Sequence, residues 1–576
     1  MNNLFKRQIE IFRSLDRVKK VAIIATFLFL MMFCFIHIML VRDTFFVDNA
    51  GNINSTLEGY GDIPLHMTQI SKFAFDKSFN LDEPIYFGRD LQYHFLFNLL
   101  RGKLLSLTNS WSFAVLWPVY ILVTANIILI FMIYYRLIKN LWLSVCSMLL
   151  FYLGAGTAGW AVLLGEKMKI ITKLTAEYPQ QNVVFGPVMS MSFIHQQTFI
   201  FGFSVFLILI LLIDKLQNKF NWKIASVGII TLGIIPVAHM HSFIAIIIFA
   251  FVSFVFAFKN KQTNYQKNIL KVFVPGFILA LPSIYFLTAS QNGSTDSPLR
   301  FHLGWMVERG IGSANFVTEA GRGLFSLDYL SFLFTNFGLI IPIVLAVFVY
   351  FVIKYRTSYD QTLRNLYPYL WTSIIIFALI NLIQFQTWDY DNNKLLAYSL
   401  FFASPLVFWI LGNVGKNRII LKRILIGLIL TSFILSGLVD IIFRLNVKRN
   451  SLYQIFSKDS VLVAEYIKDK IQEDDLILTS LSHTNPVVSL SGRQIVAGYT
   501  GWLWSRGINY QSREKAIKDF YALPSRESSL LKEYNIKYIL LDRSIAGNFI
   551  ENTKKFDRLF DREFVSGENV LYRVRE

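Results

Sequence analysis

Long apolar runs separated by short polar segments occupy the first 445 or so residues of the chain. A helix of about 20 apolar residues is long enough to cross a bilayer. By that criterion we predict about 11 spans. They are Val21–Val41, Trp111–Tyr135, Leu141–Leu164, Thr198–Ile213, Ile224–His241, Ser242–Phe258, Ile269–Thr288, Leu327–Ile353, Tyr367–Phe385, Leu395–Leu411 and Ile424–Phe443.

The loops between these spans fall into two sets that predict the orientation. Five short loops are basic, namely RLIKN, DKLQNKFNWK, KNKQTNYQK, KYRTSYDQTLR and VGKNRIILKR. Because basic loops stay in the cytoplasm, we place them and the Lys/Arg-rich N-terminus inside. An odd number of spans then puts the C-terminal region outside the cytoplasmic membrane. No small-residue cleavage site follows the first span, so we expect a retained anchor.

The composition agrees with a polytopic α-helical membrane protein. Of 576 residues, 54% are hydrophobic and only 16% are charged, against about 25% in soluble proteins. The net charge of +18 gathers in the inside loops, so it indicates topology and no nucleic-acid partner. Cys34 and Cys146 lie within spans and predict no disulfide framework.

The first outside loop, residues 42–110, is unusually long, and long structured loops are usually functional. Two polar helix faces occur in it, Asp62, His66 and Gln69, then His94, Asn98 and Arg101. We predict two amphipathic helices at the membrane interface, with their polar faces towards a shared cavity. The alternative for Asp62 is a helix N-cap, because Pro64 would stand in the first turn.

Four other polar clusters fall on the same predicted side. They contain His195; His239 and His241; Arg300; and Trp388, Asp389, Asp391, Asn392 and Lys394. Ionisable residues at the membrane are costly and usually mark function. We therefore expect all five clusters to line one site.

Several chemistries are open to these residues. Asp389 and Asp391 could hold a divalent cation or orient a basic group; alternatively, Asp391 pairs with Lys394. His239 and His241 would share a metal only if the helix ended before them, so a metal cofactor stays open.

A phosphate ligand is the other option for the basic side chains. Arg89, Arg101 and Arg300 are candidates for a phosphate clamp, or they are interfacial arginines whose charged ends reach water.

No nucleotide-binding motif occurs in the chain, and the inside loops are too short for a nucleotide site. A lipid-linked donor would still reach an outside site, because its headgroup lies at the interface.

Residues 446–576 are mixed polar with no spanning run. Short strands are predicted at Leu476–Thr479, Gln494–Gly498 and Tyr538–Leu541, with an edge strand at Asn569–Val574, between helical segments. We predict a small extracytoplasmic α/β domain. Its segment GYTGWLWSRG is rich in aromatic residues and Arg, which suits carbohydrate binding or packing on the membrane part.

The whole pattern resembles the GT-C superfamily of integral membrane glycosyltransferases, which includes protein O-mannosyltransferases and aminoarabinose transferases. GDIPLH and FGRDLQYHF supply the long first loop, and Asp62 matches the acidic position of the family. QFQTWDYDNNK, PVAHMHS and GYTGWLW are similar to segments of an uncharacterised bacterial branch.

The resemblance implies a function for the predicted site. It implies transfer of a sugar from a polyprenyl-phosphate donor to a lipid, glycan or protein acceptor at the outer face. Asp62, His66 and Asp391 are then the catalytic candidates. The substrate-binding candidates are Arg89, His94, Arg101, His195, His239, His241, Arg300, Trp388, Asp389, Asn392 and Lys394. The alternatives are a flippase for lipid-linked saccharides and a scaffold in envelope assembly.

Overall fold

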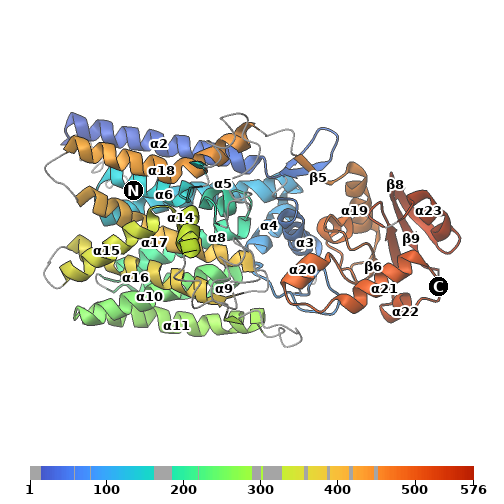
Figure 1. Ribbon diagram of the computed structural model, residues 1–576. Helices are drawn as coiled ribbons and strands as arrows, with labels where there is room; N and C mark the ends of the chain where they lie inside the picture. Colours follow the sequence, from blue (N-terminus) through green and yellow to red (C-terminus); the bar gives the residue numbers. More distant parts are fainter. Residues whose placement is uncertain are drawn as a thin grey trace.

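A helical bundle with a smaller α/β region on one of its ends makes up the computed structural model (Figure 1). The structure describes residues 14–575, except 57–58, 78–79, 158, 161–184, 218–219, 289–299, 302–326, 356–360, 386–388, 414–418, 447–451 and 546. Chain segments far apart in sequence, above all the first long loop and the C-terminal region, meet at the junction of the two parts.

Each predicted span corresponds to helix in the described part of the chain. Eight helices there are long and apolar enough to cross a membrane. They are α2 (Arg17–Arg42), α5 (Trp111–Ile138), α8 (Gln197–Lys215), α10 (Met240–Lys259), α11 (Thr263–Thr288), α16 (Gln361–Leu382), α17 (Asn393–Asn413) and α18 (Ile419–Asn446). The polytopic helical class predicted from the sequence is confirmed.

The other three predicted spans correspond to two shorter helices and one bent pair of helices. α6 (Leu141–Leu153) and α9 (Trp222–Ala238) are shorter apolar helices. α14 (Leu327–Phe337) and α15 (Ile340–Tyr355) form a pair bent by 95°. The break contains Gly338, whose φ of +55° suits glycine.

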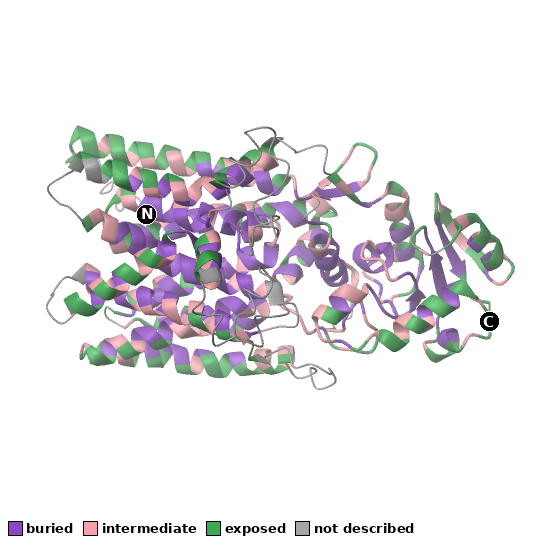
Figure 2. Ribbon diagram, viewed as in Figure 1, coloured by how far each residue is buried: buried purple, intermediate pink, exposed green. Residues whose placement is uncertain are grey.

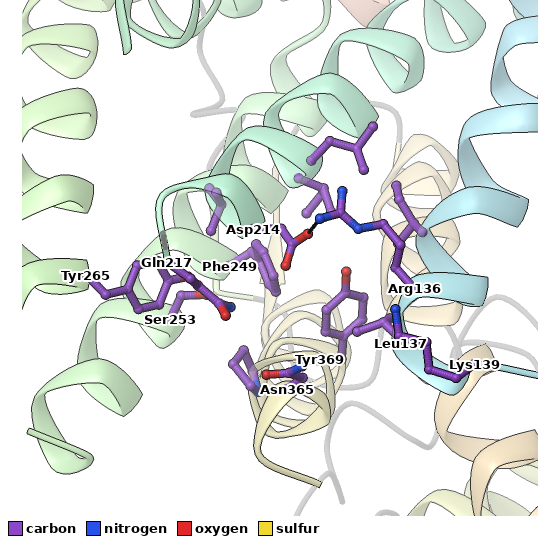
Figure 3. Close-up of a pocket in the computed structure, with 15 residues that line it drawn as sticks. Arg136, Leu137, Lys139, Asp214, Gln217, Phe249, Ser253, Tyr265, Asn365 and Tyr369 are labelled. Atoms are coloured by element: carbon purple, nitrogen blue, oxygen red, sulfur yellow. Dashed lines mark ion pairs between the residues drawn. The ribbon is translucent and has the colours of Figure 1, made fainter. Parts of the chain in front are cut away.

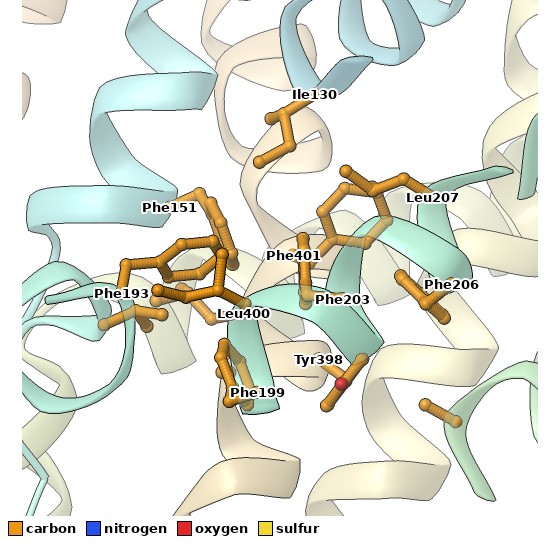
Figure 4. Close-up of a cluster of buried hydrophobic side chains, with 14 of the residues drawn as sticks. Ile130, Phe151, Phe193, Phe199, Phe203, Phe206, Leu207, Tyr398, Leu400 and Phe401 are labelled. Carbon is orange, nitrogen blue, oxygen red and sulfur yellow. The ribbon is translucent and has the colours of Figure 1, made fainter. Parts of the chain in front are cut away.

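The outer faces of the bundle are exposed, whereas its centre is buried (Figure 2). The exposed residues of its helices include large apolar side chains such as Phe27, Trp117 and Phe258. α8 and α17 are the most buried of the eight long helices. Between them lies a cluster of aromatic rings, in which Phe203 is 5.3 Å from both Phe151 and Tyr398 (Figure 4). Exposed apolar faces around a packed centre are what a bilayer environment requires.

The first long loop folds into two short strands and two helices. The strands β1 (Phe46–Val47) and β2 (Ile53–Thr56) form an antiparallel sheet with β5 (Leu452–Phe456) of the C-terminal region. The helices are α3 (Asp62–Phe75) and α4 (Leu96–Thr108). A Cβ on Gly102 would lie 2.7 Å from Phe73 Cβ and 2.8 Å from Ile70 O. Glycine at this position therefore allows the two helices to pack closely.

Only one of the two loop helices has the surroundings that were predicted for an interfacial helix. α4 exposes Leu100 and Leu107, as a helix at a membrane interface would. In α3, however, 11 of 14 residues are buried. The reason is that the C-terminal region covers it: Ser71 Oγ donates to Val488 O at 3.0 Å, and Leu65 belongs to the C-terminal core.

The C-terminal region forms a four-stranded sheet with helices around it. β6 (Ile477–Leu478) is parallel to β7 (Tyr538–Leu541), and β9 (Asn569–Arg573) lies antiparallel between β7 and β8 (Asp561–Ser566). The helical elements are α19 (Lys458–Lys470), η7 (Val487–Ser491), α20 (Thr500–Ser505), α21 (Gln511–Ala522), α22 (Ser529–Glu533) and α23 (Phe549–Asp557).

This α/β class was expected, but two strand predictions were wrong. Residues 494–498 make only isolated bridges, Tyr86↔Ala497 and Ile477↔Ile495. The last strand is internal, because β8 forms the edge. The predicted domain boundary at residue 445 falls beside the end of α18 and the undescribed residues 447–451, and it stays a prediction.

Candidate functional site

Two carboxylates and one ammonium group form the centre of the site. Asp62 begins α3, Asp391 lies in the short helix η6 (Asp389–Asn392), and Lys394 lies in the first turn of α17. Lys394 Nζ is 3.1 Å from Asp391 Oδ2, and Asp62 interacts electrostatically with both residues. The first loop and the segment between the ninth and tenth predicted spans thus supply one charged cluster.

The structure does not use Asp62 as a helix cap. Gly61 is the N-cap of α3, and no side chain caps the helix. Asp62 stands one position later, with its carboxyl group free for another role. Burial raises the pKa of Asp62, Lys394 opposes that rise and Asp391 adds to it. A carboxylate with a raised pKa is a better proton acceptor than a solvated one.

His66, one turn along α3, enters a hydrogen-bond network between α3 and α4. Asn98 Nδ2 lies 3.1 Å from His66 Nδ1 and donates to Gln69 Oε1 at 2.7 Å. Burial, with Arg101 and Lys394 nearby, lowers the pKa of His66 to about 3. His66 is therefore a neutral imidazole at physiological pH.

Arg101 completes this network and lies in the protein interior. Its guanidinium donates to Asn98 Oδ1 at 3.3 Å and to the carbonyl oxygens of Ala114 and Val115 in α5. Only 1% of Arg101 is exposed, and burial lowers its pKa to about 9. These contacts tie α4 to α5 and give Arg101 a structural task in this conformation.

A row of rings continues from the charged cluster into the bundle. Tyr93 stacks on His94 at 3.9 Å, and the His94 ring lies 5.5 Å from the His239 ring. The next ring, His241, is 5.1 Å from His239. Burial and Lys394 lower the pKa of His94 well below its usual value. The His94 ring is therefore a neutral imidazole.

His239 stands between α9 and α10, so the helix ends at Ala238, which is the condition for His239 and His241 to share a metal. Its Nδ1 accepts from the backbone N of Ser242 at 3.3 Å and lies 2.9 Å from Ser242 Oγ. Ser242 Oγ in turn is 2.5 Å from the hydroxyl of Tyr398 on α17. An Nδ1 that accepts leaves the proton of the neutral ring on Nε2.

Sequence reasoning missed two members of the site, Tyr93 and Arg506. The Arg506 guanidinium lies 4.7 Å from the centre of the Tyr93 ring, and its Nη1 is 2.7 Å from Glu83 Oε2. Arg506 follows α20 in the C-terminal region and interacts electrostatically with His66 and His94. The only signal in the sequence was the Arg- and aromatic-rich segment that contains it.

The remaining candidates lie around this centre. Asn392 is buried and closes its own loop, with Oδ1 accepting from Phe385 N and Nδ2 donating to Ile383 O. His195 precedes α8, and its neighbour Gln196 lines a small pocket with Asp391 and Lys394. Arg89 lies in the turn between α3 and α4, where its carbonyl oxygen accepts from Glu83 N.

Three candidates are described only partly or not at all. Arg300 belongs to the strand β3 (Arg300–Phe301), which pairs with β4 (Ile383–Gln384) just before the η6 segment. Asp389 begins η6. The side chains of both residues, and all of Trp388, lie outside the described residues.

A metal does not fit the described part of this cluster. Among the described residues, no group of three or more His, Cys, Asp or Glu side chains is arranged to hold a metal ion. Lys394 stands beside the two carboxylates, where it already supplies positive charge.

Comparison with known proteins places this arrangement in a known fold. No family model and no curated protein sequence matches the chain. Among solved structures, the chain is similar to the apo oligosaccharyltransferase of Archaeoglobus fulgidus, with a TM-score of 0.50 and 12% identity, over 90% of this chain and 69% of that one. The chain has a GT-C fold.

A second solved structure is similar at a lower score. It is ArnT from Cupriavidus metallidurans bound to undecaprenyl phosphate, with a TM-score of 0.48 and 9% identity, over 95% of this chain and 98% of that one. At 12% identity the likeness to the oligosaccharyltransferase concerns the fold alone, and the chemistry of this chain rests on its own side chains.

Proposed function

We propose that the protein is a membrane glycosyltransferase that moves a sugar from a polyprenyl-phosphate donor to an acceptor hydroxyl at the outer face of the cytoplasmic membrane. The observation that carries the proposal is the placement of Asp62 beside Asp391 and Lys394, where a base and a cation stand together. The donor headgroup would enter beside this cluster, with its prenyl chain in the bilayer.

Asp62 is the proposed general base. Its carboxylate takes the proton of the acceptor hydroxyl while that oxygen bonds to the anomeric carbon of the donor sugar. The bond from the anomeric carbon to the phosphate oxygen breaks, and its electron pair leaves with the phosphate. The raised pKa of Asp62 suits this task, because a base acts best when its pKa approaches the working pH.

Lys394 and Arg506 are the proposed partners of the leaving phosphate. A cation placed before the reaction stabilises the charge that develops on the phosphate in the transition state. Asp391 holds the Lys394 ammonium at 3.1 Å, which fixes its position. The neutral rings of His66 and His94 offer hydrogen bonds to sugar hydroxyls without adding positive charge.

The centre of the bundle supports an enzyme over a flippase. A carrier of polar headgroups needs polar groups along a path across the membrane. Here the space between α8 and α17 is filled by rings such as Phe199, Phe203 and Phe401, whose centres lie 5.2 to 5.7 Å from those of neighbouring rings (Figure 4).

A pair of assays on the full chain separates the two functions. The protein is placed in nanodiscs with a panel of polyprenyl-phosphate sugars, and release of polyprenyl phosphate is measured by mass spectrometry. In parallel, vesicles are used to follow movement of the same labelled lipids across the bilayer. We expect release without movement. Movement of the intact lipid-linked sugar without release would replace the transferase with a flippase.

A further inference from the structure

A second polar cavity lies at the other end of the bundle, away from the C-terminal region. It has a volume of about 230 Å³ and is lined by the ends of α5, α8, α10, α11 and α16. Loop one joins α5 at Trp111, and the cavity contains Arg136 of the same helix. At 1.5 Å per residue the two points are about 38 Å apart. The cavity is thus separate from the Asp62 site.

Polar groups converge inside this cavity (Figure 3). Arg136 and Asp214 form an ion pair at 2.5 Å, and their side chains are 41% and 39% exposed, so both remain accessible to a ligand. The hydroxyl end of Tyr369 points towards this pair from α16 (Figure 3). Tyr265 and Gln217 line the opposite wall.

The cavity and its neighbours carry an excess of positive charge. An adjoining cavity shares Tyr265, Gln217 and Asn365 with the first and adds Arg364. Four cationic residues line the connected region, Arg136, Lys139, Arg364 and Lys259. Among its described lining residues, Asp214 is the only carboxylate. An anion with several oxygens is the complementary ligand.

An apolar groove continues from the adjoining cavity along the outside of the bundle. The groove has a volume of about 430 Å³ and runs between α10, α15 and α16, with Trp371 and Ile375 among its lining residues. Phe256 lines both the groove and the adjoining cavity. The outer wall is exposed, with Phe251 at 64% and Val352 at 55%, so the groove opens to the side where acyl chains would lie.

We propose that these connected cavities bind one membrane lipid with a phosphate headgroup. The phosphate lies among Arg136, Lys139 and Arg364, and one chain of the lipid fills the groove beside Trp371. On the predicted topology this lipid belongs to the cytoplasmic leaflet, opposite to the proposed sugar transfer. The site stands on its own geometry and does not depend on the proposed function.

Native mass spectrometry of the full chain tests this proposal with phosphatidylglycerol as the probe. Two changes remove the complementarity separately: Arg364→Gln removes a headgroup cation, and Val255→Trp fills the groove. We expect Arg364→Gln to lower lipid retention about tenfold, the loss typical of one charged contact. Val255→Trp should lower retention by a similar factor, because the lipid chain no longer fits the groove. Lys223→Gln, a change of an exposed lysine at the same end of the bundle, is the matched control and should retain lipid like the wild type.

Two further probes identify the source of the phosphate. Diacylglycerol, which has no phosphate, should not be retained, and inorganic phosphate should not displace the lipid. If Val255→Trp does not fold, Val352→Phe on the exposed rim replaces it. Unchanged retention in both the cation and groove variants, equal retention of diacylglycerol, or displacement by inorganic phosphate would each overturn the lipid site.

Discussion

At the scale of single residues, the site is decided by which charges are buried together. Asp62, Asp391 and Lys394 come from two segments more than 300 positions apart. Burial raises the pKa of Asp62, Lys394 opposes that rise and Asp391 adds to it. Their polar character and predicted side of the membrane could be read from the sequence. Tyr93 and Arg506 could not, because an Arg over a ring 413 positions away leaves no local pattern.

The raised pKa of Asp62 predicts an acidic limit to activity. A general base works only when ionised, so the rate of transfer should fall as the pH drops through the Asp62 pKa. That limit should lie above 3.8, the usual pKa of aspartate. Because Lys394 lowers the pKa of Asp62, Lys394→Gln should move the limit to higher pH. The measurement is kcat/KM for polyprenyl phosphate release against pH; a limit at or below 3.8 in the wild type contradicts Asp62 as the base.

Removal of the Lys394 charge should also slow transfer directly. Lys394→Gln removes the proposed cation for the leaving phosphate, and we expect the rate of release at saturating donor to fall about 10²-fold or more. Lys103→Gln, an exposed lysine of α4 on the same side of the molecule, serves as control. If Lys394→Gln released polyprenyl phosphate at the wild-type rate, Lys394 would not stabilise the leaving phosphate, and that role would pass to Arg506 alone.

At the scale of elements, the sequence predicted where helices are but not what covers them. Hydropathy located the spans because a bilayer imposes a fixed length of apolar helix. The same pattern placed α3 at a membrane interface, but Leu65 of α3 belongs to the C-terminal core. A buried polar face and an interfacial polar face have the same helical periodicity, so the covering element has to be seen in the structure.

The contact between loop one and α20 gives a prediction at this scale. The Glu83–Arg506 pair is buried, with side chains 2% and 9% exposed. Removal of one partner leaves a buried charge, so Glu83→Gln should cost about 3–5 kcal/mol of unfolding free energy. The double variant Glu83→Gln/Arg506→Gln should recover part of that loss, measured by thermal unfolding in detergent.

A surface pair across the same two segments is the control for this prediction. Lys77 lies 3.4 Å from Glu473, but its side chain is 89% exposed, and such pairs contribute little. Lys77→Gln should therefore melt like the wild type. Equal effects of Lys77→Gln and Glu83→Gln would show that the interface does not depend on the buried pair.

At the scale of the whole molecule, the C-terminal region and the first loop form one end of the protein. β5 extends the loop-one sheet, and Trp502 Nε1 donates to Gly61 O at 3.1 Å, directly before Asp62. The α/β class of this region followed from its alternating strands and helices. The contacts of this region with residues 53–85 could not be predicted from the sequence, because pairing across 400 residues is set by tertiary packing.

The predicted orientation can be tested with reporters on the full-length chain. A reporter after Arg444 should lie outside, and one within Lys416–Arg423 should lie inside, because the proposed inside loops are basic. Accessibility to a membrane-impermeant reagent reads out each position. A cytoplasmic reporter after Arg444 would move the Asp62 site to the inner face.

The rate of polyprenyl phosphate release by Asp62→Asn is the most direct test of the proposed transfer. Asparagine keeps the shape of the side chain and removes the base, so release should fall by about 10² or more. Membrane insertion and thermal unfolding should stay close to the wild type, because Asp62 does not cap α3. Near-normal release by a folded Asp62→Asn protein would contradict the assignment of Asp62 as the base.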